Sequence, residues 1–412
     1  KELPHSVVGY QKSKMKVFAL LDIALGTFVV YRFVRDFLTA TRAKPQEDES
    51  PKKPIRVWMD GCFDMFHFGH ANALRQAKAL GDVLVVGICS DEEILAHKGP
   101  PVMKEDERVA QVRACKWVDE VVTGMPYEVD QDYLDMLLNK YNIDYVVHGD
   151  DECLTADGRD AYEAVKKAGR FKTIKRTEGV STTDIVGRML LLTKSHHMPS
   201  DKGDGSSLDA HHPIAKGDDI ARISHFLPTT RRINQFSPGK APEPSDVIVY
   251  VDGAWDMFHV GHISILEKAK ALGTFLLVGI HDDDTVNKYQ GSNHPIMNLH
   301  ERTLSILSCK FVDEVIIGAP ECITRDMIVT MNIKVVAEGF CGEERLHANG
   351  SDPYQVAKDM GMYTKVTGDF TMTIDDILER ILHHKQEFEK KFNKKSAKEK
   401  EYLETKSYVP ET

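Results

Sequence analysis

Two histidines that frame a glycine, in His67-Phe68-Gly69-His70, are the side chains best placed for chemistry in this sequence. They follow the loop Asp60-Gly61-Cys62-Phe63-Asp64, which comes directly after a short apolar run. A helix that begins at the histidines would place both imidazoles on one face, and its first amides would attract an anion. Gly69 would let a ligand approach the backbone closely. The spacing matches neither the dinucleotide glycine fingerprint nor the Walker loop, so it predicts a phosphate site of another kind.

The same pattern occurs a second time along the chain. The loop Asp252-Gly253-Ala254-Trp255-Asp256 leads into His259-Val260-Gly261-His262 at a constant offset from the first pair. Further matches follow in the same order, and Val118-Asp119-Glu120-Val121 recurs as Val312-Asp313-Glu314-Val315. The chain therefore contains two homologous copies, which predicts two domains of the same fold.

The elements that must position these histidines alternate between strands and helices. In the first copy we expect strands over residues 55–59, 82–88, 120–123 and 145–148, and helices over 68–80, 105–114, 132–141, 159–168 and 183–192. This alternation predicts an α/β fold with two tandem Rossmann-like, doubly wound parallel sheets. Ligands of such sheets bind at the carboxyl ends of the strands, where the His67 loop is expected.

Composition limits the classes of partner. The sequence has 412 residues, which suits two domains of ordinary size with extensions. Its formal net charge of -10 at pH 7 leaves no excess of Lys and Arg to neutralise a nucleic acid, so we expect no such partner. The 7 cysteines include no Cys-x-x-Cys pair, and this usage indicates a reducing compartment.

An apolar segment near the start, residues 17–34, is just long enough to cross a bilayer. Basic residues flank both of its ends, so the charge pattern fixes no orientation. Asp22 would cost about 3 kcal/mol near the middle of a membrane, and an amphipathic or buried helix is the alternative. We expect a hydrophobic helix that anchors the chain and leaves the folded domains in the cytosol.

These features divide the chain into five parts. Residues 1–52 are the expected anchor and linker, 53–194 the first domain, 195–245 an inter-domain linker, 246–384 the second domain and 385–412 a charged tail. The second half of the linker, residues 226–239, carries apolar anchors and is expected to pack across the domains. The tail is expected to be a solvated helix, with a membrane-surface or partner helix as the alternative.

The first copy resembles the cytidylyltransferase family, within the larger His-x-Gly-His nucleotidylyltransferase superfamily. Lys98, in His97-Lys98-Gly99, resembles the family's phosphate-binding lysine, and His148-Gly149-Asp150-Asp151 resembles its base-side loop. Arg176-Thr177-Glu178-Gly179-Val180-Ser181-Thr182-Thr183 closely matches the family's R-T-x-G-[IV]-S-T-[ST] motif. Plain helix capping by the hydroxyls of that motif is the competing interpretation, and the two roles are compatible.

The resemblance implies a reaction in which a phosphomonoester attacks the α-phosphate of CTP and pyrophosphate leaves. It implies catalytic roles for His67, His70, Lys98 and Arg176. It also implies contacts with CTP for Gly61, Cys62, Phe63, Gly69, His148, Gly149, Asp150, Asp151, Gly179, Ser181, Thr182 and Thr183. Mg²⁺ is expected on the triphosphate, and no residue is assigned as a protein ligand of a metal.

The tandem arrangement resembles family members that act on phosphoethanolamine in phosphatidylethanolamine biosynthesis. Members that act on phosphocholine carry one such domain followed by a long lipid-binding helix. The implied acceptor is therefore phosphoethanolamine, and no single residue identifies it. Phosphocholine as acceptor, ATP as donor, and a membrane-attached nucleotide-binding regulator without turnover remain as alternatives. Relatives with an N-terminal extension are associated with the mitochondrial outer membrane, and the endoplasmic reticulum remains open.

The second copy has lost most of the residues that accompany the histidines. Lys98 aligns with Gln290, His148-Gly149-Asp150 with Glu338-Gly339-Phe340, and Arg176 with Gly368. Ser181-Thr182-Thr183 aligns with Thr373-Ile374-Asp375, where a carboxylate would repel pyrophosphate. We expect poor or no turnover there. Nucleotide binding stays possible through Gly253, Ala254, Trp255, His259, Gly261, His262, Gln290, Glu338, Gly339, Thr373 and Asp375.

Single-domain relatives pair their active domains. The resemblance therefore implies that the two copies form an intramolecular pseudo-dimer. A homodimer of the whole chain is the further possibility.

Overall fold

The computed structural model describes residues 53–127, 129–151, 153, 159–177, 179–191, 226–291, 294–340 and 352–391. The predicted anchor, residues 1–52, lies outside them, as do residues 195–225 of the predicted linker and 392–412 of the predicted tail. Within the described ranges, no helix is both long enough and apolar enough to span a membrane. The described residues from Pro54 onward belong to one compact unit.

The first copy contains a five-stranded sheet in the order β3-β2-β1-β4-β5, and every neighbouring pair is parallel. Its strands are β1 Arg56–Gly61, β2 Val83–Cys89, β3 Glu120–Met125, β4 Tyr145–Gly149 and β5 Phe171–Ile174. The chain leaves β1 toward β2 on one side and returns to β4 on the other. The switch point of the sheet therefore lies between β1 and β4. The His67 loop begins at the carboxyl end of β1, beside this switch point.

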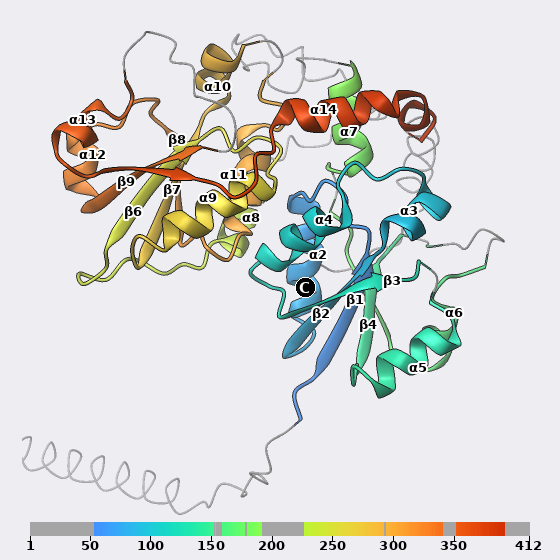
Figure 1. Ribbon diagram of the computed structural model, residues 1–412. Coiled ribbons are helices and arrows are strands. Elements are labelled where there is room, and N and C mark those ends of the chain that lie inside the picture. The colour runs from blue at the N-terminus through green and yellow to red at the C-terminus, as the bar shows by residue number, and fades with distance from the viewer. Residues whose placement is uncertain are drawn as a thin grey trace, which may run out of the picture. The chain divides into compact units, whose positions relative to one another are not determined.

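Helices cover both faces of this sheet. They are α2 Phe68–Lys78, α3 Asp91–Lys98, α4 Glu105–Ala114, α5 Gln131–Asn139, α6 Glu163–Lys167 and α7 Thr182–Leu191. Figure 1 shows α5 and α6 on one face and α2 and α4 on the other. The predicted parallel α/β fold is confirmed, while two elements, α3 and β5, were not expected from the sequence.

The helix expected over residues 159–168 is shorter in the structure, where α6 begins only at Glu163. The Asp160 carboxylate accepts a hydrogen bond from the amide of Tyr162 at 3.0 Å and so closes a turn ahead of the helix. An Asp side chain that bonds to the backbone two residues further on favours such a turn over a helical start.

The second copy repeats the fold with a sheet in the order β10-β9-β6-β7-β8. Its strands are β6 Ile248–Gly253, β7 Phe275–His281, β8 Glu314–Ala319, β9 Ile333–Phe340 and β10 Tyr363–Thr367. Its helices are α9 Val260–Lys270, α10 Asp283–Gln290, α11 Leu299–Leu307, α12 Arg325–Thr330, α13 Gln355–Asp359 and α14 Ile374–His383. The duplication predicted from the sequence is confirmed strand by strand (Figure 1).

The segment between the copies contains α8, Phe226–Phe236, which packs across them. The buried Phe236 ring lies 4.9 Å from the Trp117 ring of the first copy, measured between centroids. On the other side, the Ser237 hydroxyl donates to Glu314 of the second copy at 3.4 Å. The expectation that residues 226–239 pack across the domains is confirmed for this part.

The two copies are joined by contacts that repeat in matching pairs. Cys115 and Cys309 lie opposite each other in an antiparallel bridge. Arg188 of α7 forms an ion pair with Glu301 of α11, and both N···O distances are 2.8 Å. Arg380 of α14 pairs in the same way with Glu107 of α4, at 2.7 and 2.9 Å. Each copy therefore holds the last helix of the other.

Candidate active site

The two histidines of the first copy lie where α2 begins. His67 is the N-cap residue, and its Nδ1 accepts the Gly69 amide at 3.1 Å. The His67 amide in turn lies 3.4 Å from Nδ1 of His70, and the two rings stack with centroids 4.0 Å apart. Because each Nδ1 accepts a backbone N–H, each neutral ring carries its proton on Nε2. Both imidazoles therefore present an N–H donor suited to phosphate oxygens.

Gly69 lies in a crowded part of the site. A Cβ atom at this position would lie 2.8 Å from Cε1 of His67 and 2.9 Å from Cγ1 of Val180. The space beside Gly69 is thus taken by the stacked imidazole and by the loop that precedes α7. The glycine therefore lets these parts of the site lie close together, and the close approach of a ligand to its backbone stays a prediction.

The loop that precedes the histidines is fixed by two buried side chains. The Asp64 carboxylate accepts the amides of Val102 and Met103 at 2.9 and 2.8 Å. Arg108, which is fully buried, donates through one nitrogen to the carbonyls of Cys62 and Cys89 at 2.8 and 2.9 Å. Sequence reasoning gave neither residue a role. The sequence does carry a signal for them, because both residues recur in the second copy as Asp256 and Arg302.

This support holds the loop in a sparsely populated backbone conformation. Phe63 and Met65 have φ values of 50° and 48°, which are uncommon for residues other than glycine. Trp255 and Met257 adopt the same conformation in the second copy, with φ values of 55° and 50°. We call residues 60–70 and 252–262 the first and second signature loops.

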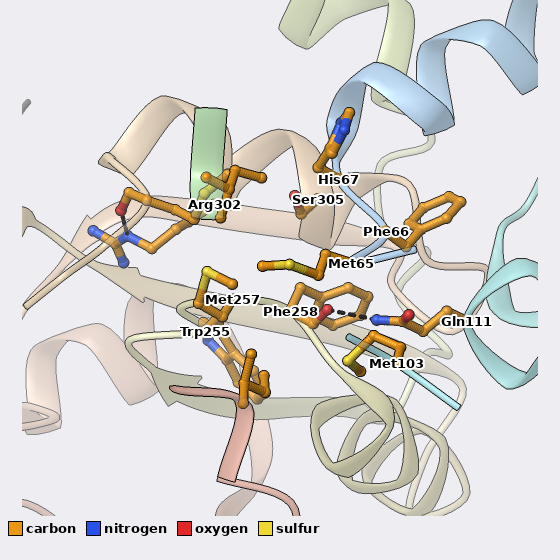
Figure 2. A pocket seen from close by; sticks show the side chains of 13 residues that line it. Met65, Phe66, His67, Met103, Gln111, Trp255, Met257, Phe258, Arg302 and Ser305 are labelled. Atoms are coloured by element: carbon orange, nitrogen blue, oxygen red, sulfur yellow. Dashed lines mark hydrogen bonds between the residues drawn. The ribbon is translucent and has the colours of Figure 1, made fainter. Parts of the chain in front are cut away.

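The signature loops meet at a small, mostly apolar cavity between the copies. Figure 2 shows Met65 and Phe66 on one side and Met257 and Phe258 on the other. The Gln111 side-chain amide crosses the boundary and donates to the Phe258 carbonyl at 2.9 Å (Figure 2). This cavity belongs to the packing between the copies.

Lys98 ends α3 and lies beside the first signature loop. Its Nζ atom lies 5.0 Å from the centroid of the Tyr127 ring. Burial opposes the charge of this ammonium, but Cys62, Tyr127 and Cys153 outweigh it and raise the pKa of Lys98. A hydrogen bond from Cys89, together with the charges of Lys98 and Arg108, lowers the pKa of Cys62 to about 6. Lys98 is therefore a permanent cation at this site.

The predicted base-side residues gather at the carboxyl end of β4. His148, Gly149, Asp150 and Asp151 line a pocket of about 390 Å³. The His148 ring packs on Tyr162 with centroids 4.8 Å apart. The Asp150 carboxylate accepts the amide of Arg176 at 2.9 Å and so ties this loop to the segment that precedes α7.

The segment before α7 both caps the helix and contacts the first signature loop. The Ser181 hydroxyl accepts the Asp184 amide at 3.1 Å, which is the capping role considered as the competing interpretation. The Thr182 hydroxyl donates to the Asp64 carbonyl at 2.9 Å. Gly179 has a φ of 83°, and Thr183 lies in the first turn of α7. The start of α7 is therefore fastened to the loop that carries the histidines.

Asp60 is a site residue that sequence reasoning missed. It is buried at the end of β1, and its Oδ1 accepts the Tyr162 hydroxyl at 3.0 Å. Burial raises the pKa of this carboxyl, while His148 and Tyr162 oppose the rise. The signal in the sequence was its recurrence, with Tyr162, as Asp252 and Tyr354.

The second copy reproduces the histidine geometry in a more enclosed form. His259 caps α9 and accepts the Gly261 amide at 3.2 Å, and its ring lies 3.8 Å from that of His262. Burial lowers the pKa of His259 to about 3 and that of His262 well below its usual value. Gly253, Ala254 and Trp255 precede these histidines in the second signature loop. The Trp255 indole N–H donates to the Gly279 carbonyl at 2.8 Å.

The surroundings of the second histidine pair differ at each place where the sequence predicted a loss. Gln290 ends α10 where Lys98 ends α3, and Glu338 at the end of β9 accepts the Tyr363 hydroxyl. A Cβ atom at Gly339 would lie 2.7 Å from Ile265. Thr373 caps α14 with Asp376, Ile374 is buried, and Asp375 is exposed in the first turn.

A doubly wound parallel sheet with a His-x-Gly-His helix start at its switch point defines the nucleotidylyltransferase class of enzymes. In the first copy, the Lys98 ammonium and the two imidazole N–H groups lie by the same loop.

The family model for cytidylyltransferase-like proteins matches residues 58–188 and 250–402. The chain is 52% identical to an ethanolamine-phosphate cytidylyltransferase of Dictyostelium discoideum, over 86% of this chain and 98% of that protein. It is 52% identical to one of Arabidopsis thaliana, over 87% of both chains, and 43% identical to one of Mus musculus, over 90% of this chain and 96% of that protein. The chain therefore belongs to the cytidylyltransferase-like family, in its ethanolamine-phosphate cytidylyltransferase branch.

Proposed function

We propose that this chain transfers the cytidylyl group of CTP to phosphoethanolamine, forming CDP-ethanolamine and pyrophosphate in phosphatidylethanolamine biosynthesis. The observation that carries the proposal is the first-copy site, where the Thr182–Asp64 hydrogen bond fastens the start of α7 to the loop of His67 and His70. The similarity to ethanolamine-phosphate cytidylyltransferases over nearly the whole chain supports the choice of acceptor.

The proposed reaction is an in-line displacement at the α-phosphorus. A phosphate oxygen of phosphoethanolamine forms the new P–O bond while the bond to the β-phosphate oxygen breaks and pyrophosphate leaves. Negative charge gathers on the equatorial oxygens, so rate enhancement comes from positioning and preorganised donors rather than from a covalent nucleophile.

Each part of the first site has a role in this scheme. The Nε2–H groups of His67 and His70 donate to the oxygens that gain charge. Lys98 stabilises the phosphates of donor and acceptor as a permanent cation. Arg176 and the amides at the start of α7 hold the leaving pyrophosphate, while the Ser181 hydroxyl caps the helix behind them.

Asp60 supplies a place for the ammonium group of the acceptor. In the second copy, the corresponding Asp252 accepts the hydroxyls of Tyr354 at 2.6 Å and Tyr250 at 3.3 Å, and His281 lies 3.6 Å away. Trp58 and Cys89 replace Tyr250 and His281 in the first copy. Among the described residues, Asp60 accepts fewer internal hydrogen bonds than Asp252, and a buried carboxylate of this kind favours a cationic ligand, which supports an acceptor site in the first copy.

CTP enters this scheme as its Mg²⁺ complex, with the ion on triphosphate oxygens and water. The Asp64 carboxylate of the first signature loop already accepts two backbone amides, and we keep Asp60 for the acceptor's ammonium group. We therefore treat the ion as part of the substrate, where it neutralises charge on the phosphates.

The experiment that tests this function is a substrate screen that measures pyrophosphate release. CTP with phosphoethanolamine should give rapid release, and phosphocholine, glycerol phosphate, or ATP in place of CTP should give little. Asp60→Asn should raise the KM for phosphoethanolamine by about tenfold while the KM for CTP changes little. Equal rates with phosphocholine would overturn the choice of acceptor, and no release with any acceptor would overturn the transferase.

We further propose that residues 17–34 anchor the chain to the mitochondrial outer membrane or the endoplasmic reticulum with the catalytic domains in the cytosol. The support is the apolar run in the sequence. Deletion of residues 1–52 should move the protein from the membrane to the soluble fraction of a cell lysate, and retention in the membrane fraction would contradict the proposal.

A further inference from the structure

The last helix of the second copy returns to the active site of the first. In Figure 1, α14 runs beside α7 above the first sheet, and these helices are in contact. Arg380 pairs with Glu107 and donates to the Val102 carbonyl at 3.3 Å. Because Val102 and Met103 are the residues whose amides Asp64 accepts, α14 is fastened to the same strip of chain as the first signature loop.

The chain continues past α14 as a helical segment to Lys391. Phe388 in this segment is only 4% exposed and belongs to the same hydrophobic cluster as Phe63, Met65 and Phe66 of the first signature loop. A buried aromatic ring fixes the position of the residues that follow it. Lys391 is half-buried, and its Nζ atom lies 5.7 Å from the centroid of the Phe388 ring.

The charges around Lys391 are those of the first active site. Burial and the charge of Lys98 lower the pKa of Lys391, and Asp64 and Cys62 oppose this. The Asp64 carboxylate is already committed to two backbone amides. Lys391 forms no ion pair with any other residue in the part of the chain that the structure describes. Two ammonium groups beside a carboxylate that is already hydrogen-bonded to two backbone amides favour the binding of a polyanion.

We propose that Lys391, from the second copy's C-terminal segment, binds a phosphate group of a substrate at the first active site. The inference rests on the proposed function and extends it, because it makes the first site incomplete without the second copy. The phosphate belongs to either CTP or phosphoethanolamine, and the kinetic constants of the two substrates distinguish these sources.

The neighbouring residue provides a matched control. Lys390 is exposed and lies about 100° further round the helix from Lys391. A general effect of net charge or of the tail would appear equally in substitutions at both positions. A substrate contact would appear only at position 391.

The test compares Lys391→Ala, Lys391→Arg and Lys390→Ala in the full chain. Lys391→Ala should raise the KM of one substrate by about tenfold, with little change in the thermal midpoint, and Lys391→Arg should restore part of the loss. A rise for CTP alone assigns the triphosphate, and a rise for phosphoethanolamine alone assigns the acceptor. Unchanged constants for Lys391→Ala, or an equal change for Lys390→Ala, would overturn the proposal.

A direct binding measurement separates this proposal from the proposed function. Titration calorimetry of the same variants with MgCTP and with phosphoethanolamine requires no turnover. An inactive wild-type chain that binds CTP would refute the transferase, whereas weaker binding of either substrate by Lys391→Ala than by Lys390→Ala would still support the contact. Equal affinities of the two variants for both substrates would refute the contact whatever the activity.

Discussion

The two signature loops of this chain fold alike, but they are surrounded by different residues. Ring separations of 4.0 and 3.8 Å in the two histidine pairs, and the same capping bonds, show that the loop is a stable unit in both copies. The differences lie at the ends of neighbouring elements. Gln290 replaces Lys98 in the second copy, and among the described residues the Asp60 carboxylate accepts fewer side-chain hydrogen bonds than that of Asp252. The comparison indicates that this loop is a shared scaffold, and we expect turnover to depend on the residues placed around it.

The second copy nevertheless contributes to the first through the packing between them. Arg188 of α7 is paired with Glu301 of the second copy, and the segment that follows α14 contributes Phe388 to the hydrophobic cluster that includes the first signature loop. We therefore expect the second copy to be retained because it positions elements of the first.

The largest effect that would sharpen the comparison comes from exchanging the residues that end α3 and α10. Lys98→Gln should lower kcat/KM by about 10²–10³-fold, because it removes a permanent cation from the charge-accumulating phosphates. The reciprocal Gln290→Lys should leave the rate unchanged, since the second copy also carries Gly368 in place of Arg176. Steady-state rates of CDP-ethanolamine formation measure both, and an equal loss in the two variants would contradict the asymmetry.

A smaller effect is expected from the two matching ion pairs. Glu301→Gln should lower kcat several-fold and the free energy of unfolding by about 1–3 kcal/mol, because it leaves the half-buried Arg188 at α7 without its strongest partner. Glu107→Gln should cost similar stability but act mainly on KM, through α14 and Lys391. Denaturant titrations and steady-state kinetics test this split. Identical kinetic changes in the two variants would show that the pairs serve stability alone.

The smallest effect on activity is expected from His259, whose burial acts on how stability depends on pH. His259 has a pKa of about 3 in the folded chain, below its usual value, so protonation favours the unfolded state. Its contribution is fully present above about pH 6.5 and is lost as the pH falls toward 3, at up to about 1.4 kcal/mol per pH unit. His259→Gln should flatten the fall in unfolding free energy between pH 7 and 5, as measured by urea titration. A slope equal to that of the wild type would contradict the burial of a neutral imidazole.

Much of the fold could be predicted from the sequence because its signals are local. The apolar run of β2 and the histidines at the start of α2 each carry their own pattern. β5 escaped prediction because its four residues, Phe171–Ile174, form a short edge strand with exposed positions. α3 escaped because its apolar face is reduced to Ile94, and its ends are set by the Ser90 cap and by Gly99.

The residues of the site could be predicted only where the motif is continuous. The histidines and the Arg176–Thr183 stretch belong to continuous patterns. Asp60 and Tyr162 meet across 102 positions, and Thr182 reaches the carbonyl of Asp64 across 118. Such pairings arise from how the strands are ordered in the sheet, which no local pattern records. Lys391 lies further still along the chain from the first signature loop, in a segment whose composition indicated a solvated helix, with a membrane-surface or partner helix as the alternative.

The central claim is that the first copy performs the reaction and the second supports it. The most direct test is the rate of CDP-ethanolamine formation by two double variants, His67→Asn with His70→Asn, and His259→Asn with His262→Asn. Asparagine can still cap a helix, so each loop keeps its helix start. We predict that the first variant loses at least about 10³-fold in rate while the second keeps most of the wild-type rate. Equal residual activity in the two variants would contradict the account.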